Sequence, residues 1–134
     1  MHLPTEIVAR IEQILAATSK VGGHIDNEAA RHGGIALMGT IGAVWILRPD
    51  GSFWESDDEI NQTLVPLSLE WQHAALACGA TRFEWIAPLV PQRPVSAITC
   101  LTCQGVGKIF VAGSDAGSGV FCPACFARGW NPAA

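Results

Sequence analysis

The residues best suited to chemistry are four cysteines arranged as two pairs. Cys100 and Cys103 form the first pair, Cys122 and Cys125 form the second, and two residues separate the members of each pair. This spacing lets both sulfurs of a pair face one ion, and zinc takes four thiolates tetrahedrally at about 2.3 Å. With eighteen residues between the pairs, the pattern predicts one four-cysteine zinc site.

Four cysteine ligands leave no open coordination position, so the expected Zn²⁺ is structural and holds the surrounding chain in its fold. A single pair of this kind can also be redox-active. Iron–sulfur and disulfide chemistry therefore stay open as alternatives to zinc. Gly105 and Gly107 follow the first pair, and we expect them to form tight turns that bring backbone amides to the sulfurs.

The two cysteine segments are similar to a known repeat. Residues 100–107, Cys-Leu-Thr-Cys-Gln-Gly-Val-Gly, match the CxxCxGxG repeat of the DnaJ chaperone zinc-finger domain, and residues 122–129 resemble a second copy with Ala127 in place of the first glycine. That family carries four repeats and two zinc ions, whereas this chain has two repeats and no His-Pro-Asp signature of a J domain. The resemblance implies four zinc ligands and a role in protein contact, but not a co-chaperone.

A second polar cluster occurs near the N-terminus. It contains two histidines and two carboxylates within nine residues: His24, Asp26, Glu28 and His32. A metal or acid–base site is one interpretation. Glycine pairs flank the segment on both sides, however, which favours a loop or short helical turn with a polar surface. Because no catalytic set is visible elsewhere, we expect a protein that is not an enzyme.

An acidic segment follows a predicted β-hairpin. Arg48-Pro49-Asp50-Gly51 has the residues of a turn, and five carboxylates then fall within residues 50–59 without a basic residue. One interpretation is a solvated loop that keeps an edge strand soluble. The other is a recognition surface for a basic partner, with an exposed tryptophan as its anchor. The predicted partner-binding residues are Trp54, Glu55, Asp57, Asp58, Glu59 and, in the cysteine region, an exposed Trp130.

Hydrophobic spacing predicts the elements that would position these groups. A helix should begin at Pro4 and end at Gly22-Gly23, and a second should run from Ser68 to Cys78 with Gly79 at its end. Residues 35–38 and 43–47 are apolar on both faces, which is typical of central strands. Thr81-Arg82-Phe83-Glu84 matches a capping box that would begin a short helix.

Three prolines, Pro88, Pro91 and Pro94, recur at the period of a polyproline II helix and predict a stiff spacer. We therefore expect an α+β domain over residues 1–87, with a small antiparallel sheet packed with helices. The Pro-rich spacer covers residues 88–97, and a zinc-ribbon-like module covers residues 98–134.

Composition restricts the classes of partner. The 134 residues are 49% hydrophobic and 15% charged, with a formal net charge of −4. Such a charge argues against nucleic acid, since nucleic-acid binders usually present a basic patch. Glu6, Arg10 and Glu12 interrupt any apolar signal core, and no run approaches the roughly 18 apolar residues of a membrane span. We expect a cytoplasmic protein that contacts neither nucleic acid nor membrane.

The N-terminal part is similar to a second family. A first helix, a glycine-punctuated sheet with Leu47-Arg48-Pro49-Asp50-Gly51 at a hairpin, and an acidic stretch resemble the SUKH superfamily of bacterial immunity proteins. This resemblance implies a small protein that neutralises a partner, often a basic toxin. The predicted function is a non-enzymatic, zinc-stabilised protein-binding protein, most concretely an immunity or antitoxin-like inhibitor. The alternative is a thiol-redox or chaperone accessory protein that uses the cysteine pairs.

Overall fold

The computed structural model describes residues 1–40, 43–57, 63–110 and 120–133. The chain divides into two compact units, Met1–Val90 and Pro91–Ala134. Among the described residues, no helix has the length and apolar character needed to cross a membrane.

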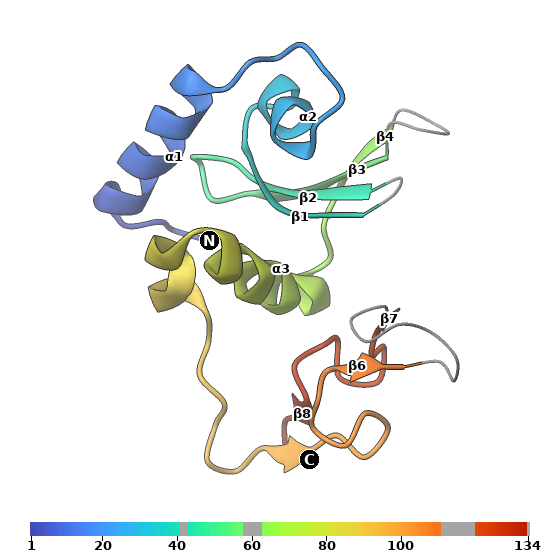
Figure 1. Ribbon diagram of the computed structural model, residues 1–134. Coiled ribbons are helices and arrows are strands. Elements are labelled where there is room, and N and C mark those ends of the chain that lie inside the picture. The colour runs from blue at the N-terminus through green and yellow to red at the C-terminus, as the bar shows by residue number, and fades with distance from the viewer. Residues whose placement is uncertain (41–42, 58–62, 111–119, 134) are drawn as a thin grey trace. The chain divides into compact units, whose positions relative to one another are not determined.

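The amino-terminal unit is built on one antiparallel sheet with the strand order β1-β2-β3-β4. Its strands are β1 (Ile35–Thr40), β2 (Ala43–Leu47), β3 (Phe53–Asp57) and β4 (Thr63–Pro66) (Figure 1). The predicted hairpin is confirmed: β2 pairs with β3, and the Gly51 amide donates to the Arg48 carbonyl at 3.0 Å. Helices and a small antiparallel sheet together confirm the α+β class.

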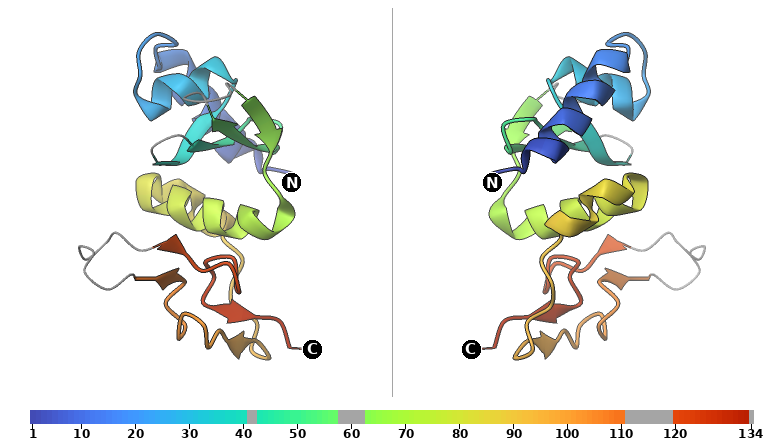
Figure 2. Two further views of the ribbon diagram at one scale, coloured as in Figure 1. Left: turned by 90° about the vertical axis from the view of Figure 1, so that its right-hand side faces the viewer. Right: turned by 90° about the vertical axis from the view of Figure 1, so that its left-hand side faces the viewer.

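Helices cover both faces of this sheet. They are α1 (Thr5–Ala17), α2 (Ile25–Arg31), α3 (Leu69–Arg82) and the 3-10 helix η1 (Glu84–Leu89). The views in Figures 1 and 2 place α2 and α3 on opposite faces. Ala29 of α2 packs in a core cluster with Ala36, Val44 and Ile46. Against the other face, α3 approaches so closely that a Cβ on Gly79 would lie 2.6 Å from Leu37 Cδ2.

The helix boundaries correct two predictions and decide between two alternatives in a third. The first helix ends at Ala17, well before Gly22, and the Thr18 hydroxyl donates to the Ile14 carbonyl at 2.6 Å. The segment predicted as a loop or a short helical turn forms a helix of seven residues, Ile25–Arg31. Gly79 lies inside α3, which continues to Arg82.

The predicted capping box at Thr81–Glu84 is also wrong. Thr81 belongs to the last turn of α3, where its hydroxyl donates to the Ala77 carbonyl at 3.3 Å. The short helix that follows begins at Glu84 with Phe83 as its cap and has no side-chain capping bond. The Thr-x-x-Glu pattern of a capping box therefore begins here at the end of α3, not at the start of a helix.

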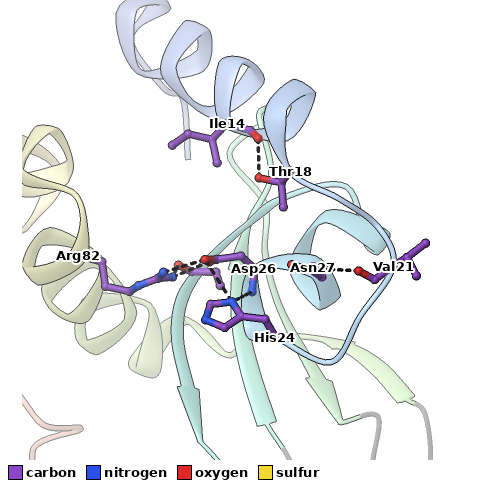
Figure 3. Close-up of polar contacts among 8 residues, drawn as sticks. Ile14, Thr18, Val21, His24, Asp26, Asn27 and Arg82 are labelled. Atoms are coloured by element: carbon purple, nitrogen blue, oxygen red, sulfur yellow. Dashed lines mark hydrogen bonds and ion pairs between the residues drawn. The ribbon is translucent and has the colours of Figure 1, made fainter.

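Strand β1 lies at an edge of the sheet, not in its centre as predicted. It is nevertheless buried, because α2 and α3 cover its two faces; Leu37 is fully buried. The register shifts between Ala36 and Met38. Arg82 closes this edge by donating to the Ala36 carbonyl and forming an ion pair with Asp26 (Figure 3).

The described residues of the carboxyl-terminal unit form four strands of two residues each: β5 (Ile98–Thr99), β6 (Lys108–Ile109), β7 (Val120–Phe121) and β8 (Trp130–Asn131). Strand β5 pairs with β8, and β6 pairs with β7. The buried cluster of this unit consists of the four cysteines, with Ile109 packed against them. Of the prolines assigned to a spacer, Pro88 lies inside η1, and Pro94 accepts a hydrogen bond from Ala97 in a turn.

Candidate metal centre

The four predicted cysteines converge on one point. All four sulfurs lie within 4.8 Å of one another. The Sγ atoms of Cys100 and Cys122 are 3.9 Å apart, and those of Cys103 and Cys125 are 3.6 Å apart. A tetrahedron with metal–sulfur bonds of about 2.3 Å places its sulfurs roughly 3.8 Å apart. The cysteines are therefore positioned to bind one metal ion, and each is at most 6% exposed.

Two equivalent knuckles build this site, and we name them the first knuckle (residues 100–107) and the second knuckle (residues 122–129). Facing cysteines are 22 positions apart in the chain. The amide of Gly105 donates to the Cys100 carbonyl at 3.0 Å, and that of Ala127 donates to the Cys122 carbonyl at the same distance. The flanking strands follow the same two-fold relation, because β5 corresponds to β7 and β6 corresponds to β8.

Each knuckle also supports the other. The Cys100 amide donates to the Gly129 carbonyl, and the Cys122 amide donates to the Gly107 carbonyl, both at 3.0 Å. A Cβ on Gly129 would lie 2.4 Å from the Gly105 carbonyl oxygen. Only glycine leaves room for the two knuckles to approach in this way.

Backbone amides reach the sulfurs, as the glycine pattern predicted. Gly107 donates to Cys103 Sγ and Gly129 donates to Cys125 Sγ, both at 3.2 Å. Both glycines have left-handed φ angles, +84° and +86°. Such hydrogen bonds stabilise thiolate charge, so the turn that positions each sulfur also prepares it for a cation.

Left-handed backbone extends to residues that the sequence did not mark. Gln104 and Phe126 occupy equivalent positions with φ of 54° and 52°. Ala127 has φ of 65° where its counterpart Gly105 has 82°. A side chain in this region of backbone conformation costs roughly 1–2 kcal/mol. The second knuckle therefore has backbone strain at Ala127, whereas the first knuckle has none at Gly105.

The environment separates the acidities of two thiols. The Cys103 amide lowers the pKa of the Cys100 thiol to about 7, because it donates a hydrogen bond that favours the thiolate. Burial raises the pKa of the Cys125 thiol well above its ordinary value, because it disfavours charge. A metal that binds here would find about half of the Cys100 thiols ionised at pH 7 and would displace the proton of Cys125.

The histidine and carboxylate cluster does not form a second site. The His24 ring accepts from the Asp26 amide at 3.2 Å at the start of α2, and Asp26 pairs with Arg82 at 2.9 Å (Figure 3). Glu28 accepts from the buried Ser56 hydroxyl at 2.9 Å, while His32 lies at the other end of the helix. Glu28 thus joins α2 to β3 of the sheet, and Asp26 joins it to α3. Throughout the described residues, the cysteines are the only group arranged to hold a metal.

The predicted partner-binding residues are only partly described. Trp54 is half-buried, not exposed, with the Arg48 guanidinium 4.4 Å above its ring and its indole N–H donating to Ser52 at 2.8 Å. Glu55 lies beside it in β3 and accepts from the Trp45 indole at 3.3 Å. Asp57 ends β3, and Asp58 and Glu59 lie outside the described residues.

Trp130 repeats this arrangement in the carboxyl-terminal unit. It is half-buried in β8, and the Arg128 guanidinium lies 4.6 Å from its ring centre. An arginine over the ring face contributes a cation–π interaction in both units. The expectation that the two tryptophans are exposed is therefore wrong for both.

Comparison of the chain with protein-family models, with curated proteins and with solved structures finds no match. The DnaJ and SUKH resemblances thus rest only on the residues that suggested them. What the geometry does support is a module of two CxxC pairs that can hold one metal ion.

Proposed function

We propose that the carboxyl-terminal unit binds one structural Zn²⁺ through Cys100, Cys103, Cys122 and Cys125. The observation that carries this proposal is the near-tetrahedral spacing of four buried sulfurs. Soft thiolate ligands in this geometry select zinc or iron among the common metals. When bound, the ion supplies folding free energy to a unit whose buried cluster consists of the metal ligands themselves.

Metal analysis of the purified chain tests this assignment. We expect one zinc per chain by elemental mass spectrometry, and loss of that zinc in Cys103→Ser and Cys122→Ser variants. Cys78→Ser is the matched control, because Cys78 lies in α3 and is not one of the four converging cysteines. If the protein isolated from its native host contains iron and shows the coloured spectrum of an iron tetrathiolate, the bound metal is iron and not zinc.

We further propose that the chain is a non-enzymatic protein-binding protein, most concretely a cytoplasmic immunity or antitoxin-like inhibitor of bacterial origin. Its support is the distribution of charge. Residues 1–90 hold eleven of the twelve acidic residues and five of the eight basic residues. An excess of carboxylates favours a basic partner and speeds its association. The candidate surface is the acidic hairpin with Trp54, Glu55, Asp57, Asp58 and Glu59.

Co-purification from the native host, followed by mass spectrometry, tests the inhibitor. We expect a basic protein whose toxicity or activity the chain suppresses. Changing all four carboxylates of the candidate surface to their amides should weaken the affinity of that complex at low salt by at least tenfold. These residues are Glu55, Asp57, Asp58 and Glu59. A matched control neutralises four exposed carboxylates elsewhere in the unit: Glu6, Glu12, Glu70 and Glu84. Equal losses in the two variants would show that net charge, and not the hairpin, attracts the partner.

One observation favours the alternative of thiol redox chemistry. Cys103 and Cys125 have sulfurs only 3.6 Å apart, so a two-electron oxidant such as peroxide could join them as a disulfide while it is reduced to water. Burial of the cysteines opposes access of the oxidant. Zinc release that follows disulfide formation under mild peroxide would support this function, whereas retained zinc with free thiols would contradict it.

A further inference from the structure

The two-fold relation between the knuckles gives the carboxyl-terminal unit an internal control. Equivalent residues have the same burial at the metal ligands and at the closing glycines: Cys100 with Cys122, Cys103 with Cys125, and Gly107 with Gly129 are all buried. Their backbone hydrogen bonds are also the same. If the shared backbone of the knuckles requires a certain type of side chain at a position, that type should occur in both knuckles. A type that occurs in only one knuckle has another cause.

Exposed aliphatic residues on the strands satisfy this test of recurrence. Ile98 in β5 and Val120 in β7 occupy equivalent positions, and both are 57% exposed. β-branched residues favour strands, so the frame explains both side chains. They need no further function.

The tips of the knuckles differ. Leu101 is 85% exposed and Val106 is 64% exposed in the first knuckle. The equivalent positions of the second knuckle hold Pro123 and Arg128. Since the same backbone accepts proline and arginine there, neither metal binding nor folding demands two exposed aliphatic side chains in the first knuckle.

Charge indicates what would cover them. The first knuckle contains no charged residue, and Lys108 follows it directly. Arg93 lies next to its entrance, where the guanidinium donates to the Thr99 hydroxyl at 2.9 Å. The described residues from 91 to 133 include three basic residues, Arg93, Lys108 and Arg128, and no carboxylate. Apolar side chains on a knuckle that Arg93 and Lys108 flank complement a segment that carries both apolar and acidic side chains.

We propose that the first knuckle docks a segment of a partner protein in which large apolar side chains stand beside carboxylates. Leu101 and Val106 provide the apolar contacts, and Arg93 and Lys108 face the acidic groups. A protein fits better than an anionic membrane, because lipid recognition of this kind uses clusters of about 4–8 basic residues. This surface is distinct from the acidic hairpin. The inference rests on the proposed metal centre, whose ion holds the knuckle in shape, and does not depend on the inhibitor.

The two-fold relation also supplies the variant that tests it. In Leu101→Pro/Val106→Arg, each new residue is the one that occupies the equivalent position of the second knuckle, so the frame should accept both. The reciprocal variant Pro123→Leu/Arg128→Val makes a matched control with changes of the same kind on the other knuckle. Leu101→Ser/Val106→Ser carries the test if the first variant loses its metal.

The probe is a displayed library of random 12-residue peptides, selected against the full-length chain loaded with zinc. We expect the selected peptides to place Leu, Ile or Phe beside Asp or Glu. Their affinity, measured by fluorescence anisotropy, should fall at least tenfold in Leu101→Pro/Val106→Arg. The reciprocal variant should retain binding to the first knuckle, and each variant should keep one zinc per chain.

Three results would overturn the docking surface: no enriched peptides, peptides that bind the zinc-loaded variant as tightly as the original chain, or selection of basic sequences. Binding to phosphatidylcholine vesicles with 30% phosphatidylserine that depends on Leu101 and Val106, in place of peptide binding, would assign the tip to membranes. The zinc content of the unaltered chain distinguishes failure of the metal centre from failure of the docking surface. Absent zinc refutes the metal centre, whereas full zinc with unaltered peptide affinity refutes only the docking surface.

Discussion

Gly107 of the first knuckle lies against Ala127 of the second: a Cβ on Gly107 would lie 2.4 Å from the Ala127 carbonyl oxygen. The carbonyl belongs to the backbone, so it cannot turn aside as the end of a flexible side chain could. The same glycine donates to Cys103 Sγ at 3.2 Å. The missing side chain of Gly107 therefore allows the two knuckles to approach closely, and the amide of the same residue bonds to the Cys103 sulfur.

We predict that Gly107→Ala and Gly129→Ala each weaken zinc binding strongly. The left-handed φ alone costs roughly 1–2 kcal/mol with a side chain, or about tenfold in affinity, and the clash with backbone adds to it. Competition with a chromophoric chelator measures the loss. Gly23→Ala is the control, since its Cβ would meet no atom within 4 Å. Affinities unchanged from the original chain would contradict the close approach of the knuckles.

Ala127→Gly should act in the opposite direction. Ala127 has φ of 65°, and glycine removes the steric cost of that conformation while adding entropy to the unfolded chain. The net gain should be up to about 1 kcal/mol, seen as tighter zinc binding in the same chelator assay. Ala124→Gly in the same knuckle has no positive φ to relieve and should give no gain. A weaker site in Ala127→Gly would rule out strain at this position.

Zinc affinity should fall as the pH is lowered from 8 to 6. Burial raises the pKa of Cys125, so its proton is bound without metal throughout this range and zinc must displace it. Cys100, with a pKa of about 7, is mostly a thiolate at pH 8 but gains a proton by pH 6. Competition between zinc and protons therefore becomes steeper below pH 7.

Calorimetry in buffers of different ionisation enthalpy measures the protons released on binding. We expect more protons released per zinc at pH 6 than at pH 8. A count that stays constant over this range would mean that Cys100 does not ionise near neutrality.

Arg82→Ala should destabilise the amino-terminal unit. It removes the ion pair with Asp26, which is about one-third exposed and so weakly stabilising, and it removes the donor to the Ala36 carbonyl at the edge of the sheet. Together these losses should cost about 1–2 kcal/mol in urea unfolding. Arg82→Lys should recover only part, since lysine lacks the fork that bonds both partners.

The exposed Arg10 in α1 provides the control for this experiment. Arg10→Ala should change the free energy of unfolding by less than about 0.5 kcal/mol. If Arg82→Ala is equally mild, the edge of β1 does not depend on the arginine.

Local signals predicted the parts of this molecule that are determined locally. The turn at Asp50-Gly51 and the two cysteine pairs depend on residues a few positions apart, and the sequence located both. The predictions that were wrong concern residues whose structural role depends on contacts with distant parts of the chain. Gly79 has the character of a helix end, but it is present because Leu37 lies against α3. Glycine serves either purpose, and only packing distinguishes them.

Burial misled the prediction for β1 in a similar way. Apolar residues on both faces of a strand show that both faces are covered, but not that the strand has two neighbours. Here α2 and α3 cover the faces, and a side chain closes the edge: Arg82 and Asp26 are 56 positions apart. In the metal centre, the left-handed φ of Phe126 and Ala127 follows from the two-fold frame. Neither residue type signals that conformation.

The crossed pairing of β5 with β8 has a consequence for synthesis on the ribosome. Strand β8 ends at Asn131, and the Gly129 carbonyl is needed to accept from Cys100. The site of the first cysteine pair is therefore incomplete until the chain has been translated to Asn131, whereas every element of the amino-terminal unit is made before Pro91. Binding of the proposed zinc therefore follows synthesis of the amino-terminal unit, and a shortage of zinc would leave molecules with a finished amino-terminal unit and an unfinished carboxyl-terminal one.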